Sequence, residues 1–198
     1  MNDLQKRAIN ARSTSHSVEA FILGRWSPRA MTGDPITNDE LMQLLEAARW
    51  APSSYNDQPW RFVYAKRDSE HWDRFFSLLG EWNQGWCKNA AALMAIVAKK
   101  DFKKTGKPNV NAEFDTGAAW MALALQGAST GLVVHGMAGF DYDRAASELG
   151  VPDDHTVLAM CAVGRLADAS TLPEEYQSIE TPSDRNPIES FANEGRFE

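Results

Sequence analysis

Two arginines and a serine alternate in the segment GRWSPRAM, residues 24–31. Arg25, Ser27 and Arg29 fall on every second position around Pro28, and alternate side chains of an extended chain point to the same side. Two guanidinium groups and a hydroxyl on one side suit a phosphate or another anionic group, because arginine donates its hydrogen bonds in a fixed fork. The alternative interpretation is a pair of solvated surface arginines beside a turn.

A second polar segment, APSSYNDQPW, follows an amphipathic stretch and leads into an apolar one. Pro52 and Pro59 fix φ at both ends of this loop and disfavour helix at the residue before each, so the loop has a restricted shape. Between the prolines lie two hydroxyls and two amides that could hold a polar ligand, Ser53, Ser54, Asn56 and Gln58. The alternative is a polar turn whose side chains bond to their own backbone.

The helices that must position these loops are predicted from hydrophobic spacing. Thr37 and Glu40 form a capping box, and apolar residues then recur at helical spacing until Pro52 ends the helix. A second amphipathic helix is predicted from an Asp68-Ser69 cap, with Trp72, Phe75, Phe76 and Leu79 on one face. Residues 113–131 are apolar nearly all round and rich in Ala and Gly, which indicates a central helix packed on several sides. Another subunit could supply one of these packing surfaces. Residues 143–149 predict a short helix that ends at Gly150.

Four strands are predicted, at residues 61–66, 90–100, 132–134 and 157–164. The elements do not alternate as they do in a doubly wound fold, so the predicted class is a helix-dominated α+β fold. No repeat or linker divides the chain, and a single domain over residues 1–198 is expected, with a flexible N-terminal arm at 1–17 and a C-terminal tail from about 171 to 198.

The composition excludes several classes of partner. The 198 residues carry a net charge of −7 and their pI is about 5.1, which argues against nucleic acid or an anionic membrane as the main partner. The N-terminus lacks the apolar core of a signal peptide, and the longest apolar run, residues 90–98, is too short to span a bilayer. A cytoplasmic protein is expected.

Several common catalytic motifs are absent from the sequence. It has no Gly-x-Gly-x-x-Gly after a strand, no Walker loop and no Gly-x-Ser-x-Gly elbow. Four scattered histidines, His16, His71, His135 and His155, do not have the spacing of a zinc site, so no metal site is predicted. Cys87 and Cys161 have neither metal nor redox spacing, and we interpret them as buried free thiols in a reducing compartment.

The order of these segments resembles the FMN-dependent nitroreductase family over nearly the whole chain, from Phe21 to the C-terminal NPIESFANEGRF. The Arg-x-Ser-x-Arg turn, the capped helix and the Pro-Ser-Ser-x-Asn-x-Gln-Pro loop occur in the family's order. NQGWCKNAA resembles the family's Asn-x-x-Trp segment, FDTGAAWMALALQGASTGL its central dimer helix, and HGMAGFD with VLAMCAVGR its closing pair. The resemblance implies a nitroreductase-like fold, with a mixed or antiparallel central sheet flanked by helices, and a homodimer with shared active sites in which the tail wraps the partner.

The resemblance also implies a set of FMN-binding residues. Arg25, Trp26, Ser27 and Arg29 would contact the phosphate, the ribityl chain and the pyrimidine edge, while Pro52, Ser53, Ser54 and Asn56 would close the site from the neighbouring subunit. The backbone of Met137, Ala138 and Gly139 would lie against the flavin N5 side, Arg165 would lie near the phosphate, and Asn83 at the pyrimidine edge. Many members have Glu-Gly where this chain has Ala138-Gly139, so the substrate does not follow from the resemblance.

The implied activity is hydride transfer from NAD(P)H through FMN to a nitroaromatic, a quinone or another small electron-poor acceptor, in a ping-pong scheme and with no catalytic side chain. One alternative is another flavin reaction on a small metabolite, such as dehalogenation or desaturation. A second alternative is a non-catalytic flavin-binding protein.

Overall fold

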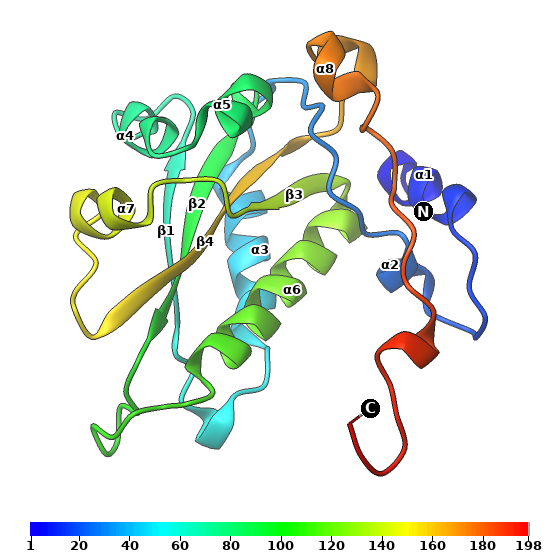
Figure 1. Ribbon diagram of the computed structural model, residues 1–198. Helices are drawn as coiled ribbons and strands as arrows, with labels where there is room; N and C mark the ends of the chain where they lie inside the picture. Colours follow the sequence, from blue (N-terminus) through cyan, green and yellow to red (C-terminus); the bar gives the residue numbers. More distant parts are fainter. Residues whose placement is uncertain (198) are drawn as a thin grey trace.

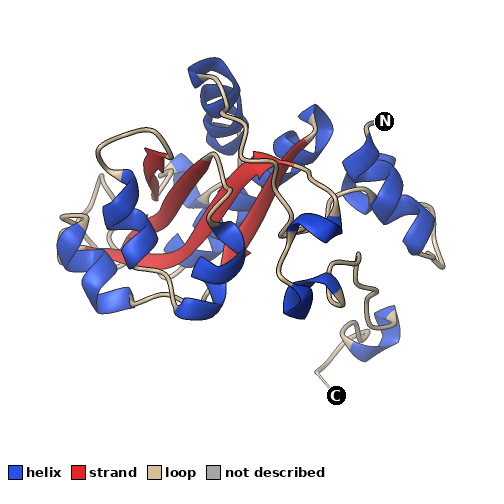
Figure 2. Cartoon of the chain, turned by 90° about the horizontal axis from the view of Figure 1, so that it is seen from above, coloured by secondary structure: helices blue, strands red, loops and turns tan. Residues whose placement is uncertain are grey.

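The computed structural model describes residues 1–197 as a four-stranded sheet with helices on both faces (Figures 1 and 2). The strands are β1 (Trp60–Lys66), β2 (Ala92–Lys99), β3 (Leu132–Met137) and β4 (His155–Arg165). The helices are α1 (Asp3–Ala11), α2 (Ala20–Leu23), α3 (Asn38–Arg49), α4 (Trp72–Ser77), α5 (Glu81–Cys87), α6 (Ala112–Thr130), α7 (Tyr142–Glu148) and α8 (Glu174–Gln177). The predicted α+β class is confirmed.

The strand order is β1-β2-β4-β3, and each neighbouring pair is antiparallel. All four predicted strands are present. β3 is longer than predicted, because His135, Gly136 and Met137 continue the pairing with β4 although their sequence is no longer a uniform apolar run.

Both faces of the sheet are buried, which explains why β2 reads as a continuous apolar run. Its side chains alternate between two cores. Leu93, Ala95 and Val97 belong to the core under α4 and α5, while Ala92, Met94 and Ile96 belong to the core under α3 and α6. The two helix layers therefore hold the sheet between them.

The start of α3 has the predicted capping box. Thr37 Oγ1 accepts from Glu40 N at 3.1 Å, and Glu40 Oε2 accepts from Thr37 N at 2.8 Å. The cap predicted for α4 is wrong: His71 is the N-cap residue and makes no side-chain cap bond. Ser69 instead donates its hydroxyl hydrogen to Lys66 O at 2.7 Å, within a turn that precedes the helix.

The central helix α6 begins and ends within one residue of its predicted bounds, and Gly131 closes it with a left-handed φ of 83°. Gly127 allows α6 to approach β3 closely, since an added Cβ there would lie 2.7 Å from Val134 Cγ2. Ala119, Leu123 and Ala124 face the sheet and are buried.

Four helices, α1, α2, α5 and α8, fall in segments where the sequence predicts none. Within the expected N-terminal arm, α1 buries Leu4 and Ala8, and Asn2 Nδ2 donates to Ala128 O at 2.8 Å. In the expected tail, the side chains of Leu172, Tyr176 and Glu180 are buried in their own chain. The N-terminal helix and the first part of the C-terminal tail thus pack against the domain, whereas residues 183–197 are exposed.

Two further predictions concern the cysteines and the membrane. Cys87 and Cys161 are free and buried, as predicted, and burial raises the pKa of each thiol to about 12. Within residues 1–197, every helix is too short or too polar to cross a bilayer.

Candidate functional site

Four arginines from distant parts of the chain surround one small cavity, which we call the arginine cavity. Its volume is about 260 Å³. It lies between β3, the segment after α2, the residue that directly follows α1, and the C-terminal segment. Its lining residues are Arg12, Arg25, Trp26, Ser27, Arg29, His135, Ile179, Thr181, Ser183 and Arg185. The guanidinium groups come from positions 12, 25, 29 and 185, so only folding brings them together.

The alternation of Arg25, Ser27 and Arg29 does place them around the same cavity, and Arg25 Nη1 donates to Ser27 Oγ at 3.0 Å. The residue between them, Trp26, is only 4% exposed and donates its indole hydrogen to Leu4 O at 3.0 Å. The chain is therefore anchored through Trp26, while the residues on either side face the cavity.

The charge in the cavity is poorly balanced by the protein. Glu180 accepts at 2.8 Å from both Arg29 N and Ala30 N, and its carboxylate lies 3.9 Å from Arg29 Nη1. Arg29 Nε is buried and has no hydrogen-bond partner in the described residues. A buried donor without a partner is costly, so the cavity has an unmet need for an acceptor.

The pKa values of Arg25 and Arg12 point to the same need. Burial lowers the pKa of Arg25, and the neighbouring Arg12 and Arg185 lower it further. Burial and Arg185 likewise lower the pKa of Arg12, while the nearby Asp184 carboxylate acts in the opposite direction. Like charges held together in a partly desolvated cavity repel, and an anion in the cavity would remove that repulsion. The residues present therefore fit a phosphate group.

His135 contributes a neutral ring to the same cavity. Its Nδ1 lies 2.9 Å from Pro28 O, and since a carbonyl only accepts, Nδ1 carries the hydrogen and Nε2 is an acceptor. Burial lowers the pKa of His135 to about 4, and the charges of Arg29 and Arg25 act in the same direction. The ring also packs on Trp86, with centroids 4.4 Å apart.

The loop between Pro52 and Pro59 is held in a strained shape by bonds to its surroundings. Tyr55, Asn56 and Gln58 have φ of 54°, 54° and 53°, a region that non-glycine residues rarely adopt. Ser53 Oγ accepts from Gln58 N at 3.0 Å, and Ser54 N donates to Asp115 Oδ2 at 2.9 Å.

This loop does not meet the arginine cavity within one chain. It contacts the first turn of α6, through Ser54 with Asn111 and Asp115, whereas the other end of α6 contacts Asn2 before α1. Figure 1 shows the loop at the lower end of the molecule, below α3 and α6, and the segment after α2 beside β3. The two predicted halves of the site therefore lie apart in a single chain.

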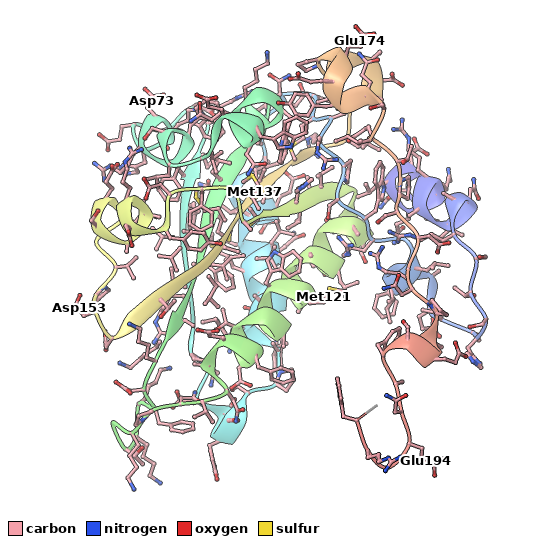
Figure 3. All side chains as sticks on the ribbon, viewed as in Figure 1. Asp73, Met121, Met137, Asp153, Glu174 and Glu194 are labelled. Atoms are coloured by element: carbon pink, nitrogen blue, oxygen red, sulfur yellow. The ribbon has the colours of Figure 1, made fainter. Side chains whose placement is uncertain are left out.

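The predicted flavin-side stretch begins at Met137, the last residue of β3, which Figure 3 labels near the centre of the molecule. Met137 is buried, while Ala138 and Gly139 are exposed. Asn83 Nδ2 donates to Gly139 O at 2.8 Å, and Asn83 Oδ1 accepts from Trp86 Nε1 at 3.0 Å. Asn83 thus holds the stretch after β3 against α5 and has its side chain engaged there.

Arg165 lies outside the arginine cavity. Its Nη2 donates to both carboxylate oxygens of Glu40, at 2.7 and 3.0 Å, and it lines a separate cavity of about 680 Å³ beside α1. Arg185 is the basic residue of the C-terminal half that reaches the arginine cavity. The sequence does not identify Arg12, His135 and Arg185 as site residues, because no local motif marks them. Long-range contacts bring them together; for example, Arg12 Nε donates to Ser183 O, 171 positions away in the sequence.

The chain is similar to known proteins over most of its length. A solved structure of an FMN-containing oxidoreductase is 44% identical and superimposes with a TM-score of 0.91, covering 96% of this chain and 97% of that one. A Bacillus subtilis (strain 168) protein described as a candidate NAD(P)H nitroreductase, YdgI, is 27% identical over 186 residues, which cover 75% of this chain and 85% of that protein.

An uncharacterized 15.4 kDa protein in the ask 5′ region of Mycolicibacterium smegmatis is 32% identical over 143 residues, covering 69% of this chain and 97% of that protein. The model of the nitroreductase family matches residues 22–84 and 69–165, a span that holds the Arg-x-Ser-x-Arg segment, the proline-framed loop and all four strands. With this match and the fold in agreement, the chain belongs to the nitroreductase family.

Proposed function

We propose that this nitroreductase-family protein is an FMN-dependent oxidoreductase that uses NAD(P)H to reduce nitroaromatics, quinones or related electron-poor acceptors. The observation that carries the proposal is the arginine cavity with its unpartnered Arg29 Nε, because it suits the phosphate of FMN. The 44% identical oxidoreductase that contains FMN supports the same cofactor.

In this proposal Arg25, Arg29 and Arg185 bind the phosphate, and Arg12 adds positive charge behind them. Ser27 and the acceptor Nε2 of His135 are placed to bind hydroxyl groups of the ribityl chain. The backbone of residues 137–139 would hold the flavin ring, and Ala138 and Gly139 are exposed there. Arg165 has no part in this assignment, since Glu40 already occupies its guanidinium group.

When bound, FMN supplies the redox chemistry, accepting a hydride from NAD(P)H and passing it to the acceptor. The protein binds and orients the cofactor and contributes positive charge, which favours an anionic reduced state. The neutral His135 donates its Nδ1 hydrogen to Pro28 O and is not placed to transfer it to a substrate. No side chain is assigned as a catalytic acid or base.

We propose further that two copies of the chain complete each site. The rigid loop carrying Pro52, Ser53, Ser54 and Asn56 closes the cofactor site of the second copy, which gives a reason for the distance between the two halves in one chain. NAD(P)H and the acceptor then occupy the same space in succession, and the kinetics are ping-pong.

The cofactor is tested with purified protein. It should be yellow, and heating should release FMN and not FAD. Protein that is colourless and takes up no added FMN would refute the proposal.

The reaction is tested by steady-state oxidation of NADPH and NADH with a quinone and with a nitroaromatic. Parallel double-reciprocal lines at several acceptor concentrations are expected, whereas intersecting lines would exclude the shared-space scheme. Flavin-loaded protein without turnover would favour a non-catalytic flavin-binding protein. Turnover only with a halogenated or saturated metabolite would favour the dehalogenase or desaturase alternative.

A further inference from the structure

A lysine-rich turn follows β2 and carries the opposite charge from the rest of the protein. Five of the nine residues from 99 to 107 are lysines and one is acidic, while the whole chain has a net charge of −7. We call residues 99–107 the lysine turn. Figure 1 shows it at the lower end of the molecule, on the same side as the proline-framed loop.

Three of these lysines are available to a ligand. Lys99 pairs with Asp154, and Lys100 Nζ donates to Asp153 O at 2.8 Å. The side chains of Lys103, Lys104 and Lys107 are exposed, and their ammonium groups form no hydrogen bond or ion pair with residues 1–197. Their positive charge is therefore not neutralised within the part of the chain that the structure describes.

The lysine turn has a defined shape. Phe102 N donates to Lys107 O at 2.9 Å, and Gly106 N donates to Phe102 O at 2.8 Å. Gly106 has a φ of 66°, which the tight turn requires. The backbone under Lys104 and Lys107 is thus ordered before any ligand binds, which lowers the entropic cost of binding.

A cavity of about 630 Å³ lies between the lysine turn and the proline-framed loop, and its volume is that of a small-molecule site. It is lined by Tyr55, Asp57, Phe102, Lys104, Thr105, Lys107 and Pro108. We call it the lysine cavity. It combines two aromatic rings, one carboxylate and two ammonium groups.

The aromatic rings and the carboxylate suit a nucleoside. Tyr55 and Phe102 are in edge contact, with centroids 5.8 Å apart, and Tyr55 is 95% exposed in the single chain, which presents an aromatic surface on which a base can stack. Asp57 is 8% exposed; its Oδ1 accepts from Lys103 N at 3.0 Å, while its Oδ2 is buried and has no partner in the described residues. A carboxylate oxygen of this kind accepts from a ribose hydroxyl or an amino group.

We propose that the lysine cavity binds the adenosine part of the nicotinamide nucleotide, and that Lys104 and Lys107 bind a 2′-phosphate, so that the enzyme prefers NADPH to NADH. This inference rests on the proposed function. It connects the two sites through the loop at 52–58, because Tyr55 and Asp57 line the lysine cavity while Ser53, Ser54 and Asn56 are assigned to the cofactor site.

The binding test uses flavin-loaded protein and two probes that lack the nicotinamide and differ only in the 2′-phosphate, 2′,5′-ADP and 5′-AMP, in isothermal titration calorimetry. The 2′-phosphate should make 2′,5′-ADP bind about tenfold more tightly, and this advantage should shrink with added salt. The double variant Lys104→Gln/Lys107→Gln should lose that advantage. The matched control Lys6→Gln removes an exposed lysine on α1 and should keep it.

The variant Tyr55→Leu should lower the affinity for both probes by the same factor, because both carry adenine. Equal affinities of the wild type for the two probes, or an unchanged advantage in the lysine double variant, would overturn the inference.

The kinetic test compares kcat/KM for NADPH with kcat/KM for NADH. The ratio should fall about tenfold in the lysine double variant and stay constant in Lys6→Gln. A constant ratio in the double variant would also overturn the inference. Flavin content is measured on each sample, because colourless protein would refute the proposed function, whereas the probe titrations test the lysine cavity separately.

Discussion

At the scale of single residues, His135 shows how the positive cavity controls a protonation state. The pKa of His135 falls from the usual 6.5 to about 4, first because of burial and also because Arg29 and Arg25 lie close. Between these two pH values the unfolded chain binds more protons than the folded one, so the free energy of unfolding decreases as the pH falls.

We therefore expect acid to destabilise the wild type more than His135→Asn. Between pH 7.5 and pH 5 the wild type should lose about 2 kcal/mol more of its unfolding free energy, as measured by urea titration. His71→Asn is the control, since the side chain of His71 is 56% exposed, and it should behave as the wild type does. Equal losses in the wild type and His135→Asn would show that His135 is not the group responsible.

A pair of arginines tests where the phosphate binds. Arg185 lines the arginine cavity, whereas Arg165 is held by Glu40 beside another cavity. Arg185→Gln should weaken FMN binding by about 1.5 kcal/mol, the cost of losing a hydrogen bond to a charged group, and Arg165→Gln should not change it. Fluorescence titration of the flavin-free protein with FMN measures both. The reverse result would favour Arg165 as the phosphate ligand.

At the scale of elements, the contact between α6 and β3 depends on a residue with no side chain. An alanine Cβ at Gly127 would lie 2.7 Å from Val134 Cγ2 and 3.2 Å from Leu132 O. Gly127→Ala should reduce the free energy of unfolding by about 1–2 kcal/mol, because an overpacking cost of about 2–3 kcal/mol exceeds the gain of about 1 kcal/mol in helix propensity.

Thermal or urea unfolding measures this change, and Ser129→Ala on the exposed end of the same helix is the control. The control should stay within about 0.5 kcal/mol of the wild type. A Gly127→Ala variant as stable as the wild type would mean that α6 shifts along β3 at little cost.

At the scale of the whole molecule, one side of α6 leaves apolar surface uncovered in the single chain. The side chain of Phe114 is 81% exposed, and a row of small or apolar residues at helical spacing continues from it, Gly117, Ala118, Met121, Ala122 and Leu125. Figure 3 labels Met121 on this helix. An apolar face of this kind fits a second copy of the chain, in agreement with the proposed shared sites.

We expect sedimentation equilibrium to find a dimer, and Met121→Lys to dissociate it and to weaken FMN retention at the same time. Tyr142→Lys is the control, because Tyr142 is 42% exposed but lies on α7, in the other helix layer. It should leave the dimer intact. A wild-type monomer that retains FMN would contradict the shared-site arrangement.

Elements with strong local signals could be predicted from the sequence alone. Apolar runs bounded by turns predicted all four strands, the Thr37–Glu40 capping box predicted the start of α3, and the Ala- and Gly-rich run predicted α6. The alternation of Arg25, Ser27 and Arg29 also survived folding, because an extended segment keeps its period of two wherever it is placed. Local spacing was enough in each case.

Long-range packing determines which charged side chains share a cavity. Arg12 and Arg185 join Arg25 and Arg29 because the two chain ends cross beside β3, and no short-range pattern records a contact across 171 positions. Arg165 is the last residue of β4, and its guanidinium group pairs with Glu40 of α3. Helix α5 also escaped prediction, since the burial of Trp86 and Cys87 against the sheet stabilises it more than its own propensity does. Contacts between distant parts of the chain position these side chains and stabilise this helix, and such contacts cannot be predicted from residue spacing along the chain.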